Sequence, residues 1–353
     1  MEAMDRRPVL FVIAAAVLYG VGLPLSKVLL GSIPPVAMAG LLYCGAFLGL
    51  CPLYAASRLV RKKDEAASGL KRKDMPWLAG SIVSGGILAP VLLMAGLDLS
   101  AGFSASLLSN LEGVATAVIA VLFFRESTGR RLWLALACMT GGAVLLSWNG
   151  GEGRFDAAGP LLVALSMVCW GIDNNFTRQI SSKDPLQTAI VKSLVAGTAP
   201  LLFVAILGGG LPWSVGMVYA LVVGSFGYGA SLVLFILGLR GLGASRTAAM
   251  FGLAPFVGAL VSLVLLREWL GWVMAPAAAF MALGAWLIVA EAHGHAHRHE
   301  PLVHDHPHVH DDAHHGHAHD GPVAGAHAHE HEHAEAVHDH PHYPDVHHRH
   351  GHD

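Results

Sequence analysis

Two stretches of the chain, AVIAVLFFRES at residues 117–127 and ALVSLVLLREW at residues 259–269, lie 142 positions apart and share an arginine–glutamate pair near their ends. The glycines of neighbouring apolar segments keep the same register, which chance alignment of apolar helices does not explain. The sequence therefore predicts an internal repeat. Further pairs in register are Leu111 with Leu253, Gly142 with Gly284 and, at a spacing of 151, Gly20 with Gly171.

The composition is that of a membrane protein. The chain has 353 residues, of which 54% are hydrophobic and only 13% are charged, whereas soluble domains carry about 25% charged residues. A helix that crosses about 30 Å of hydrocarbon needs about 20 mostly apolar residues. Continuous apolar runs predict helices rather than barrel strands, and a soluble enzyme domain is excluded. The ten predicted spans are residues 9–30, 34–57, 77–97, 102–124, 132–148, 160–180, 187–208, 215–238, 246–266 and 272–291.

The repeat sets the predicted architecture. Five spans per copy is an odd number, so the second copy must insert upside down, as in many secondary transporters. We therefore predict an all-α polytopic membrane protein of two inverted five-helix repeats, at residues 1–149 and 150–292, followed by a His-rich tail at residues 293–353.

The charges of the loops predict the orientation. With the N-terminus inside, sixteen lysines and arginines lie in inner loops, against Arg154 and Arg267 outside. Positive charge gathers on the cytoplasmic side. We predict a multi-pass protein of the bacterial inner (plasma) membrane with both termini in the cytoplasm and an uncleaved first span.

The chain resembles the EamA-type transporters of the drug/metabolite transporter superfamily, in a subgroup with a His-rich C-terminal tail. The resemblance covers about residues 9–291 and rests on the two endings quoted above and on YGVGLPLSKVLL at residues 19–30, matched by CWGIDNNFTRQI at residues 169–180. It implies ten helices around a central cavity and the movement of small metabolites, often outward. In one departure from the family pattern, Gly113 replaces a proline in the fourth span, whereas the ninth keeps Pro255.

Polar residues at membrane depth mark a candidate substrate site. Glu112 lies near the middle of its span, where a carboxylate costs on the order of 3 kcal/mol. It should therefore face a cavity, find a partner or be protonated, and the alternative to a transport role is a protonated glutamate bonded to a neighbouring helix. Asn110, two residues before it, would help to keep the region around Glu112 hydrated.

Three consecutive polar residues, Asp173, Asn174 and Asn175, lie past the middle of the sixth span. They project about 100° apart and cannot face one neighbour, so either the helix breaks, with the residues capping the break, or one side lines water. Lys192 either reaches the surface or points inward to Asp173 or a substrate carboxylate, and Lys27 can likewise reach the surface. The predicted substrate-binding residues are Lys27, Asn110, Glu112, Asp173, Asn174, Asn175 and Lys192. Glu126 and Glu268 are interpreted as structural residues of the loops.

The tail holds all 23 histidines, eleven acids and two arginines. Such a polar segment cannot build a core and is expected to be disordered. Alternating histidines in an extended chain can chelate one ion, and neutral imidazole suits zinc, nickel or cobalt. No cofactor is expected for transport itself. The predicted ligands of a divalent transition metal are His295, His297, His299, His304, His306, His308, His317, His319, His327, His329, His331, His333, His338, His340 and His342.

These features favour a secondary transporter of a small solute, an exporter driven by proton exchange at Glu112 or Asp173. A transition-metal permease is the first alternative, although the spans contain no histidine. A membrane-anchored metal sensor or store is the second. No enzyme motif occurs. The expected partners are the lipid bilayer and a small molecule or ion, with no nucleic acid, and a homodimer stays open.

Overall fold

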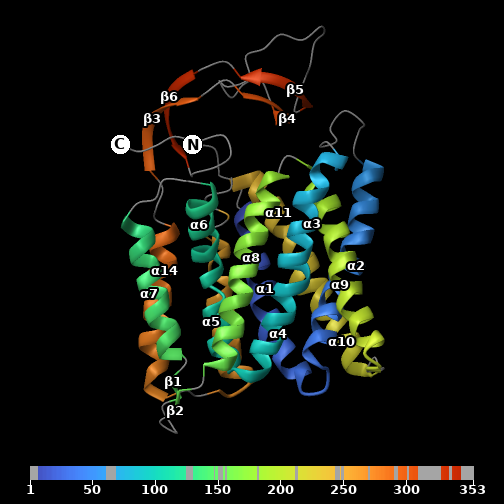
Figure 1. The fold of residues 1–353 in the computed structure, drawn as a ribbon, viewed down its shortest axis with the longest axis vertical. Coiled ribbons are helices and arrows are strands. Elements are labelled where there is room, and N and C mark those ends of the chain that lie inside the picture. Colours follow the sequence, from blue (N-terminus) through green and yellow to red (C-terminus); the bar gives the residue numbers. More distant parts are fainter. Residues whose placement is uncertain are drawn as a thin grey trace.

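The computed structural model describes residues 7–60, 69–124, 130–146, 148–149, 154–155, 157–180, 183–210, 214–242, 247, 250–268, 271–289 and four strands in the tail. The first half of the membrane body consists of α1 (Arg7–Leu30), α2 (Pro35–Val60), η2 (Arg72–Asp74), α3 (Met75–Ser81), η3 (Ile82–Leu88), α4 (Ala89–Leu99), α5 (Gly102–Leu108), α6 (Leu111–Phe124) and α7 (Arg130–Leu146). The helices run side by side as a bundle (Figure 1).

The second half follows two short paired strands, β1 (Trp148–Asn149) and β2 (Arg154–Phe155). Its helices are α8 (Ala158–Gln179), α9 (Pro185–Ile206), α10 (Val215–Val223), η4 (Gly224–Ala230), α11 (Ser231–Leu242), α13 (Ala254–Leu265), η5 (Gly271–Val273) and α14 (Met274–Val289).

Local sequence explains where several helices begin and end. Asp184 caps α9, because its Oδ1 accepts hydrogen bonds from the amides of Leu186 at 3.0 Å and Gln187 at 3.3 Å, and Pro185 is preorganised for the first helical position. The extended backbone of Ser100 ends α4. Gly271, with φ of 72°, supplies the left-handed conformation that the turn before α14 requires.

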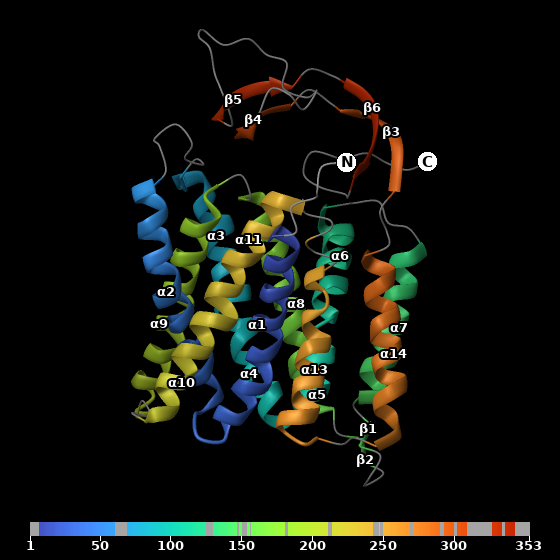
Figure 2. The same cartoon turned by 180° about the vertical axis from the view of Figure 1, so that it is seen from behind.

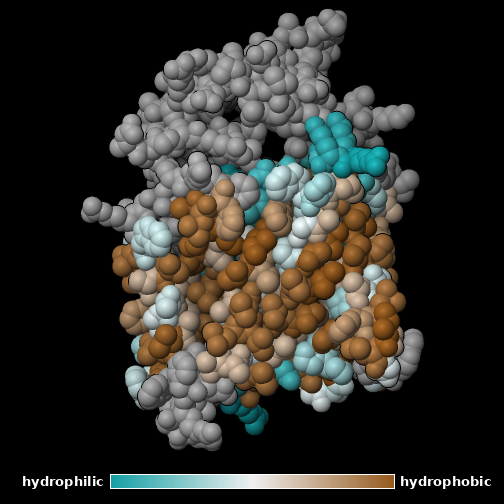
Figure 3. All heavy atoms as spheres, viewed as in Figure 1, coloured by the Kyte–Doolittle hydropathy of each residue, from teal (hydrophilic) through white to brown (hydrophobic). Residues whose placement is uncertain are grey.

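The exterior of the bundle is suited to lipid. Within the part of the chain that the structure describes, six helical segments are long and apolar enough to cross a membrane: Arg7–Leu30, Pro35–Ala56, Arg72–Leu99, Gly102–Phe123, Pro185–Ile206 and Val215–Gly238. Large apolar side chains such as Phe123, Ile206 and Val264 are between 75% and 81% exposed. Figure 3 shows a broad apolar belt on one face of the bundle. The chain is therefore an integral, multi-pass membrane protein.

The other four predicted spans fall on helices that are either shorter or more polar than these six. Three correspond to the shorter apolar helices Trp133–Leu146, Ala254–Leu265 and Gly271–Leu287. The span predicted at residues 160–180 falls on α8, which carries Asp173 and two asparagines.

The third and eighth predicted spans each contain a π-helix, an arrangement that is frequent at functional sites. These segments are η3 and η4, and they begin 142 residues apart, at Ile82 and Gly224. The fourth predicted span is divided at Ser109 and Asn110, between α5 and α6.

Pairs of helices from opposite halves of the chain make most of the packing. Helix α2 packs on α9, α7 on α14, α4 and α6 on α8, and α1 on α11 and α13 (Figure 2). Glycine permits the close approach of α2 to the π-helical span, because a Cβ at Gly45 would lie 2.9 Å from backbone atoms of Leu221.

The tail differs from the expectation of disorder in four segments. Strand β3 (His293–His299) pairs antiparallel with β6 (Ala336–His342), and β4 (Leu302–His308) pairs with β5 (His327–His333). The two-residue period of the His-x-His pattern matches that of a strand, and the register sets histidine opposite histidine, as at His295 and His340. The predicted ligands His317 and His319 lie outside the described residues.

Candidate functional site

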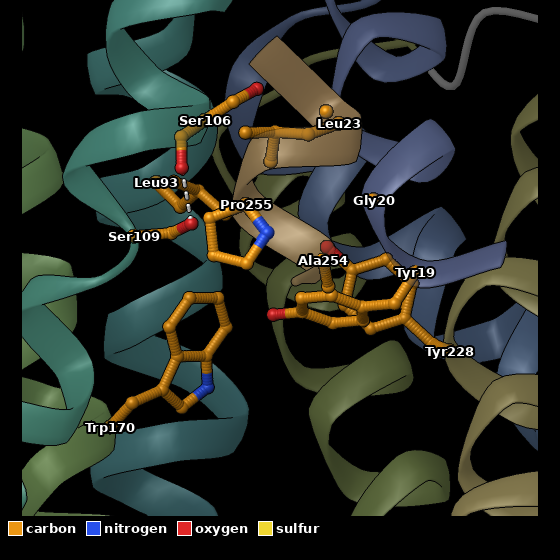
Figure 4. Close-up of a pocket in the computed structure, with 11 residues that line it drawn as sticks. Tyr19, Gly20, Leu23, Leu93, Ser106, Ser109, Trp170, Tyr228, Ala254 and Pro255 are labelled. Carbon is orange, nitrogen blue, oxygen red and sulfur yellow. Dashed lines mark hydrogen bonds between the residues drawn. The ribbon is translucent and has the colours of Figure 1, made fainter. Parts of the chain in front are cut away.

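A small pocket opens between helices of both halves (Figure 4). It is formed where α1, α4, α5, α8, η4 and α13 come together. Its walls are mostly apolar or aromatic, with two serines. The lining residues are Tyr19, Gly20, Leu23, Leu93, Ser106, Ser109, Trp170, Tyr228, Ala254, Pro255 and Gly258.

The aromatic side of the pocket is held by ring contacts and hydrogen bonds. The rings of Tyr19 and Tyr228 meet edge to face, with centroids 5.7 Å apart. Trp170 Nε1 and the Tyr43 hydroxyl both donate to the carbonyl oxygen of Gly85, at 3.0 and 3.1 Å. Because Gly85 belongs to the π-helix η3, this irregular segment fixes the indole that faces the pocket.

The break between α5 and α6 forms part of the same wall. Ser109 Oγ donates to the Ser106 carbonyl at 2.6 Å, as Figure 4 shows, and Asn110 Nδ2 donates to the Leu107 carbonyl at 2.9 Å. Asn110 is buried. The predicted substrate-binding residue Asn110 therefore satisfies a helix end, and it is Ser109 that lines the pocket.

Glu112 lies in the first turn of α6 and is half-buried. Its Oε1 accepts a hydrogen bond from Asn174 Nδ2 at 2.9 Å, and the same amide reaches Thr116 Oγ1 at 3.0 Å. Glu112 therefore lies next to the break that forms part of the pocket wall, and its hydrogen bond with Asn174 connects it to α8.

Asp173 is buried in an ion pair with Lys192 of α9. Ser81 Oγ donates to Asp173 Oδ1 at 2.5 Å, and Thr177 Oγ1 donates to the same oxygen at 3.1 Å. The absence of a side chain at Gly85 leaves the room that the Asp173 carboxyl group occupies. Of the alternatives for Lys192, the structure shows the inward one, in which the ammonium pairs with Asp173.

The helix that carries the three consecutive polar residues is continuous, so neither a break nor a cap at a break is present. Asn175 is buried, and its amide donates to the carbonyl oxygens of Thr116 at 3.0 Å and Gly171 at 2.8 Å. Asp173 faces α3 and α9, whereas Asn174 and Asn175 face α6. The polar triplet therefore joins α8 to three neighbouring helices.

Two other ionisable residues hold helix ends. Lys27 Nζ donates to the carbonyls of Leu97 at 2.7 Å and Asp98 at 2.9 Å, at the C-terminus of α4, where positive charge is favourable. The carboxylate of Glu268 accepts the amides of Gly102 at 2.7 Å and Phe103 at 2.8 Å. The structure thus gives Lys27 structural partners, as it does Glu268, and Glu126 lies outside the described residues.

Sequence reasoning missed Tyr19, Trp170, Tyr228, Ser81 and Ser109. A signal for two of them was present, because Tyr19 precedes Gly20 and Trp170 precedes Gly171 in the repeat register. Tyr228 and Ser81 carry no such signal, since their roles depend on which helices pack together.

Apolar helices at membrane depth, a pocket between the two halves and charged residues beside it define a membrane transporter of small solutes. The profile of the EamA-like transporter family matches residues 6–148 and again residues 157–290. The chain belongs to the EamA-like transporter family, whose members are transporters rather than enzymes.

Known proteins agree with this assignment. An uncharacterized transporter of Methanothermobacter thermautotrophicus is 29% identical over 269 residues, which cover 73% of this chain and 78% of the relative. A solved crystal structure of a protein aligns with a TM-score of 0.57 and 19% identity, over 81% of this chain and 96% of that one. The structural likeness concerns the fold alone.

Proposed function

We propose that the protein is a secondary transporter that carries a small solute through the pocket by alternating access. In this proposal, ten spans form two inverted five-helix repeats, at residues 1–149 and 150–292, and the halves rock about the site. The observation that carries the proposal is the pocket itself, to which both halves contribute walls beside charged residues at membrane depth.

Reciprocal packing supports the repeat. A Cβ at Gly142 would lie 3.1 Å from Met281 Cγ, and a Cβ at Gly284 would lie 2.6 Å from Met139 Cγ. The two glycines are 142 residues apart, and so are the two methionines. Such mutual contacts are expected when α7 and α14 are equivalent helices related by a two-fold axis.

A second reciprocal pair lies next to the pocket. Gly20 approaches Gly258, with its Cβ position 3.1 Å from the amide nitrogen, and Gly171 approaches Thr116, with a corresponding distance of 2.9 Å. The spacing of 151 relates the two glycines, and the spacing of 142 relates their partners. Helices α1 and α8 therefore serve as equivalent walls in the proposed repeat.

We assign the transport-coupling proton to Glu112 rather than to Asp173. Lys192 compensates the charge of Asp173, whereas the hydrogen-bond donor to Glu112 is the neutral amide of Asn174. A half-buried carboxylate with a neutral partner is more easily neutralised by a proton than one in an ion pair. The proposed direction is export across the bacterial inner membrane, which rests on the likeness to the family. The proposed orientation, with both termini in the cytoplasm, rests on the loop charges.

The tail is proposed to bind zinc, nickel or cobalt as an accessory function. Its strands repeat histidine at alternate positions, and imidazole is a preferred ligand of these ions. A metal permease is the alternative cargo assignment, with a membrane-anchored sensor or store as the second. The permease is less favoured because the predicted spans contain no histidine, a ligand that transition metals normally select.

Cysteine accessibility tests the transport proposal without knowledge of the solute. The four native cysteines are replaced by alanine, and Ser109→Cys is labelled with a membrane-impermeant thiol reagent from each side of sealed vesicles. We expect the cysteine to be labelled from either side of the membrane. The ratio of labelling from the two sides should change when a pH gradient is imposed. Val264→Cys, on the lipid-facing exterior, is the control and should stay unlabelled.

Labelling of Ser109→Cys from one side only, under every gradient, would contradict alternating access. The site would then be a vestibule or a static binding pocket.

A further inference from the structure

Among the described residues near the pocket, Glu112, Asp173 and Lys192 leave an uncompensated negative charge. Lys192 forms its ion pair with Asp173. One ammonium cannot neutralise two carboxylates. With Glu112 ionised, the group Glu112, Asp173 and Lys192 carries a net charge of −1. Because an unpaired charge at membrane depth is costly, the site favours a cation in contact with Glu112.

The pocket wall offers a second attraction for a cation. The rings of Tyr19, Tyr228 and Trp170 line it, and Tyr43 packs on Tyr228 with centroids 5.8 Å apart. Aromatic faces attract ammonium groups, and the attraction grows when the cation is desolvated. The carbonyl oxygen of Ser109, a lining residue, accepts a hydrogen bond from the backbone amide of Glu112 at 3.2 Å. Asn174, which donates to the Glu112 carboxylate, follows Trp170 by one helical turn, so the acid lies next to the aromatic wall.

The remaining walls define the body of the solute. Leu23, Leu93 and Pro255 are apolar, and Gly20 and Gly258 bring two helix backbones close to the space. A large or many-charged solute would leave polar groups unpaired against these walls.

We propose that the transported solute is a small organic amine, with its ammonium group at Glu112 and the aromatic rings and its apolar part against the leucines and proline. This inference rests on the proposed transport function and adds the chemical class of the solute. A transition-metal ion fits less well, because aromatic and aliphatic walls supply none of the ligands that such ions need.

Three probes of similar shape and different charge test the proposal: phenethylamine, 2-phenylethanol and phenylacetate. Binding to the purified full chain in lipid nanodiscs is measured by calorimetry at pH 7.5. We expect phenethylamine to bind at least tenfold more tightly than the alcohol and phenylacetate to bind most weakly. Glu112→Gln should remove the preference for the amine, whereas Asp98→Asn, which changes an exposed acid at the end of α4, should preserve it.

A matched pair of variants tests the aromatic contribution. Tyr228→Phe keeps the ring and should keep most of the preference for the amine, whereas Tyr228→Leu should reduce it severalfold. Both variants keep an apolar group at this position, so a difference in their preference for the amine measures the contribution of the aromatic ring.

Equal binding of the amine and the alcohol, preferential binding of phenylacetate, or no binding of the amine would each overturn the assignment of the solute class. Alternate labelling of Ser109→Cys would then still support a transporter, with a different solute. Failure of the labelling test together with selective binding of the amine would instead leave a receptor-like amine site and refute transport.

Discussion

At the scale of single residues, the Asp173–Lys192 pair explains how α8 tolerates an acid in the membrane. The carboxylate has an ammonium and two hydroxyl groups around it, so its charge is compensated although water is largely excluded. Removing one member of a buried pair leaves an unpaired charge, which costs about 3–5 kcal/mol, whereas removing both is often tolerated.

We therefore expect Asp173→Asn and Lys192→Met each to lower the thermal stability of the protein in detergent. The double variant should recover a large part of the loss, because neither charge is then left alone. Fluorescence-detected size-exclusion chromatography after heating measures this. Simple addition of the two losses would show that the pair is not an energetic unit.

Substitution of Glu112 should have the opposite effect: the protein should fold but not function. Glutamine at this position keeps an oxygen that can accept from Asn174 Nδ2 but cannot exchange a proton. Glu112→Gln should therefore reach the membrane in normal amounts, while the labelling of Ser109→Cys loses its response to a pH gradient. Asp98→Asn serves as the control for loss of an acid. An unchanged response in Glu112→Gln would make Glu112 a structural residue.

At the scale of helices, contacts between α7 and α14 depend on glycine at selected positions only. A Cβ at Gly284 would fall 2.6 Å from Met139 Cγ, whereas a Cβ at Gly141 would find Phe280 Cδ1 at 3.9 Å, an ordinary contact. Overpacking of this kind costs about 1–3 kcal/mol.

Gly284→Ala should therefore destabilise the protein by an amount in that range, and Gly141→Ala should leave its stability nearly unchanged. Adding Met139→Ala to Gly284→Ala should restore part of the loss, since it removes the atoms that clash. Thermal unfolding in nanodiscs provides the comparison. Equal effects of the two glycine substitutions would contradict the close approach of α7 and α14.

The sequence predicted helices well and their irregularities poorly. Apolar runs of the length of a membrane span identified the helical segments, because length and hydropathy are local properties. The π-helices η3 and η4 and the division at Ser109 and Asn110 escaped notice, since backbone geometry there depends on partners such as Tyr43 and Trp170, which bond to Gly85. The strands of the tail depend on pairing between segments far apart in the sequence, which composition does not reveal.

The candidate site was predictable in its charged part and hidden in its aromatic part. Glu112 and Asp173 stood out because ionisable groups are rare at membrane depth. Lys27 stood out for the same reason, yet it binds the end of α4, and charge alone does not separate these roles. Tyr19 and Tyr228 could not be selected from sequence, because aromatic residues are common in membrane spans and only packing brings these two together.

At the scale of the whole molecule, the tail and the helical body should have separable functions, with metal binding in the tail. The intact protein is expected to bind several zinc or nickel ions per chain, and truncation after Ala292 should remove most of this capacity. Binding should also weaken below about pH 6.5, where histidine takes up a proton and ceases to be a ligand. Elemental analysis of the purified protein, with and without the tail, measures both effects. Unchanged metal content after truncation would refute metal binding by the tail.

The two walls of the pocket also differ in a way that affects kinetics. A spacing of 151 takes Asp173 to Gly22 and Asn174 to Leu23, and a spacing of 142 takes Glu112 to Ala254, so the acids and amides on one side of the proposed two-fold axis have apolar or small counterparts on the other. The inward-open and outward-open forms are therefore not mirror versions of each other, and the half-saturating solute concentration should differ between the two faces of the membrane. Thermodynamics then requires that the maximal velocities differ in compensation, so such a carrier would work faster in one direction without storing any energy of its own.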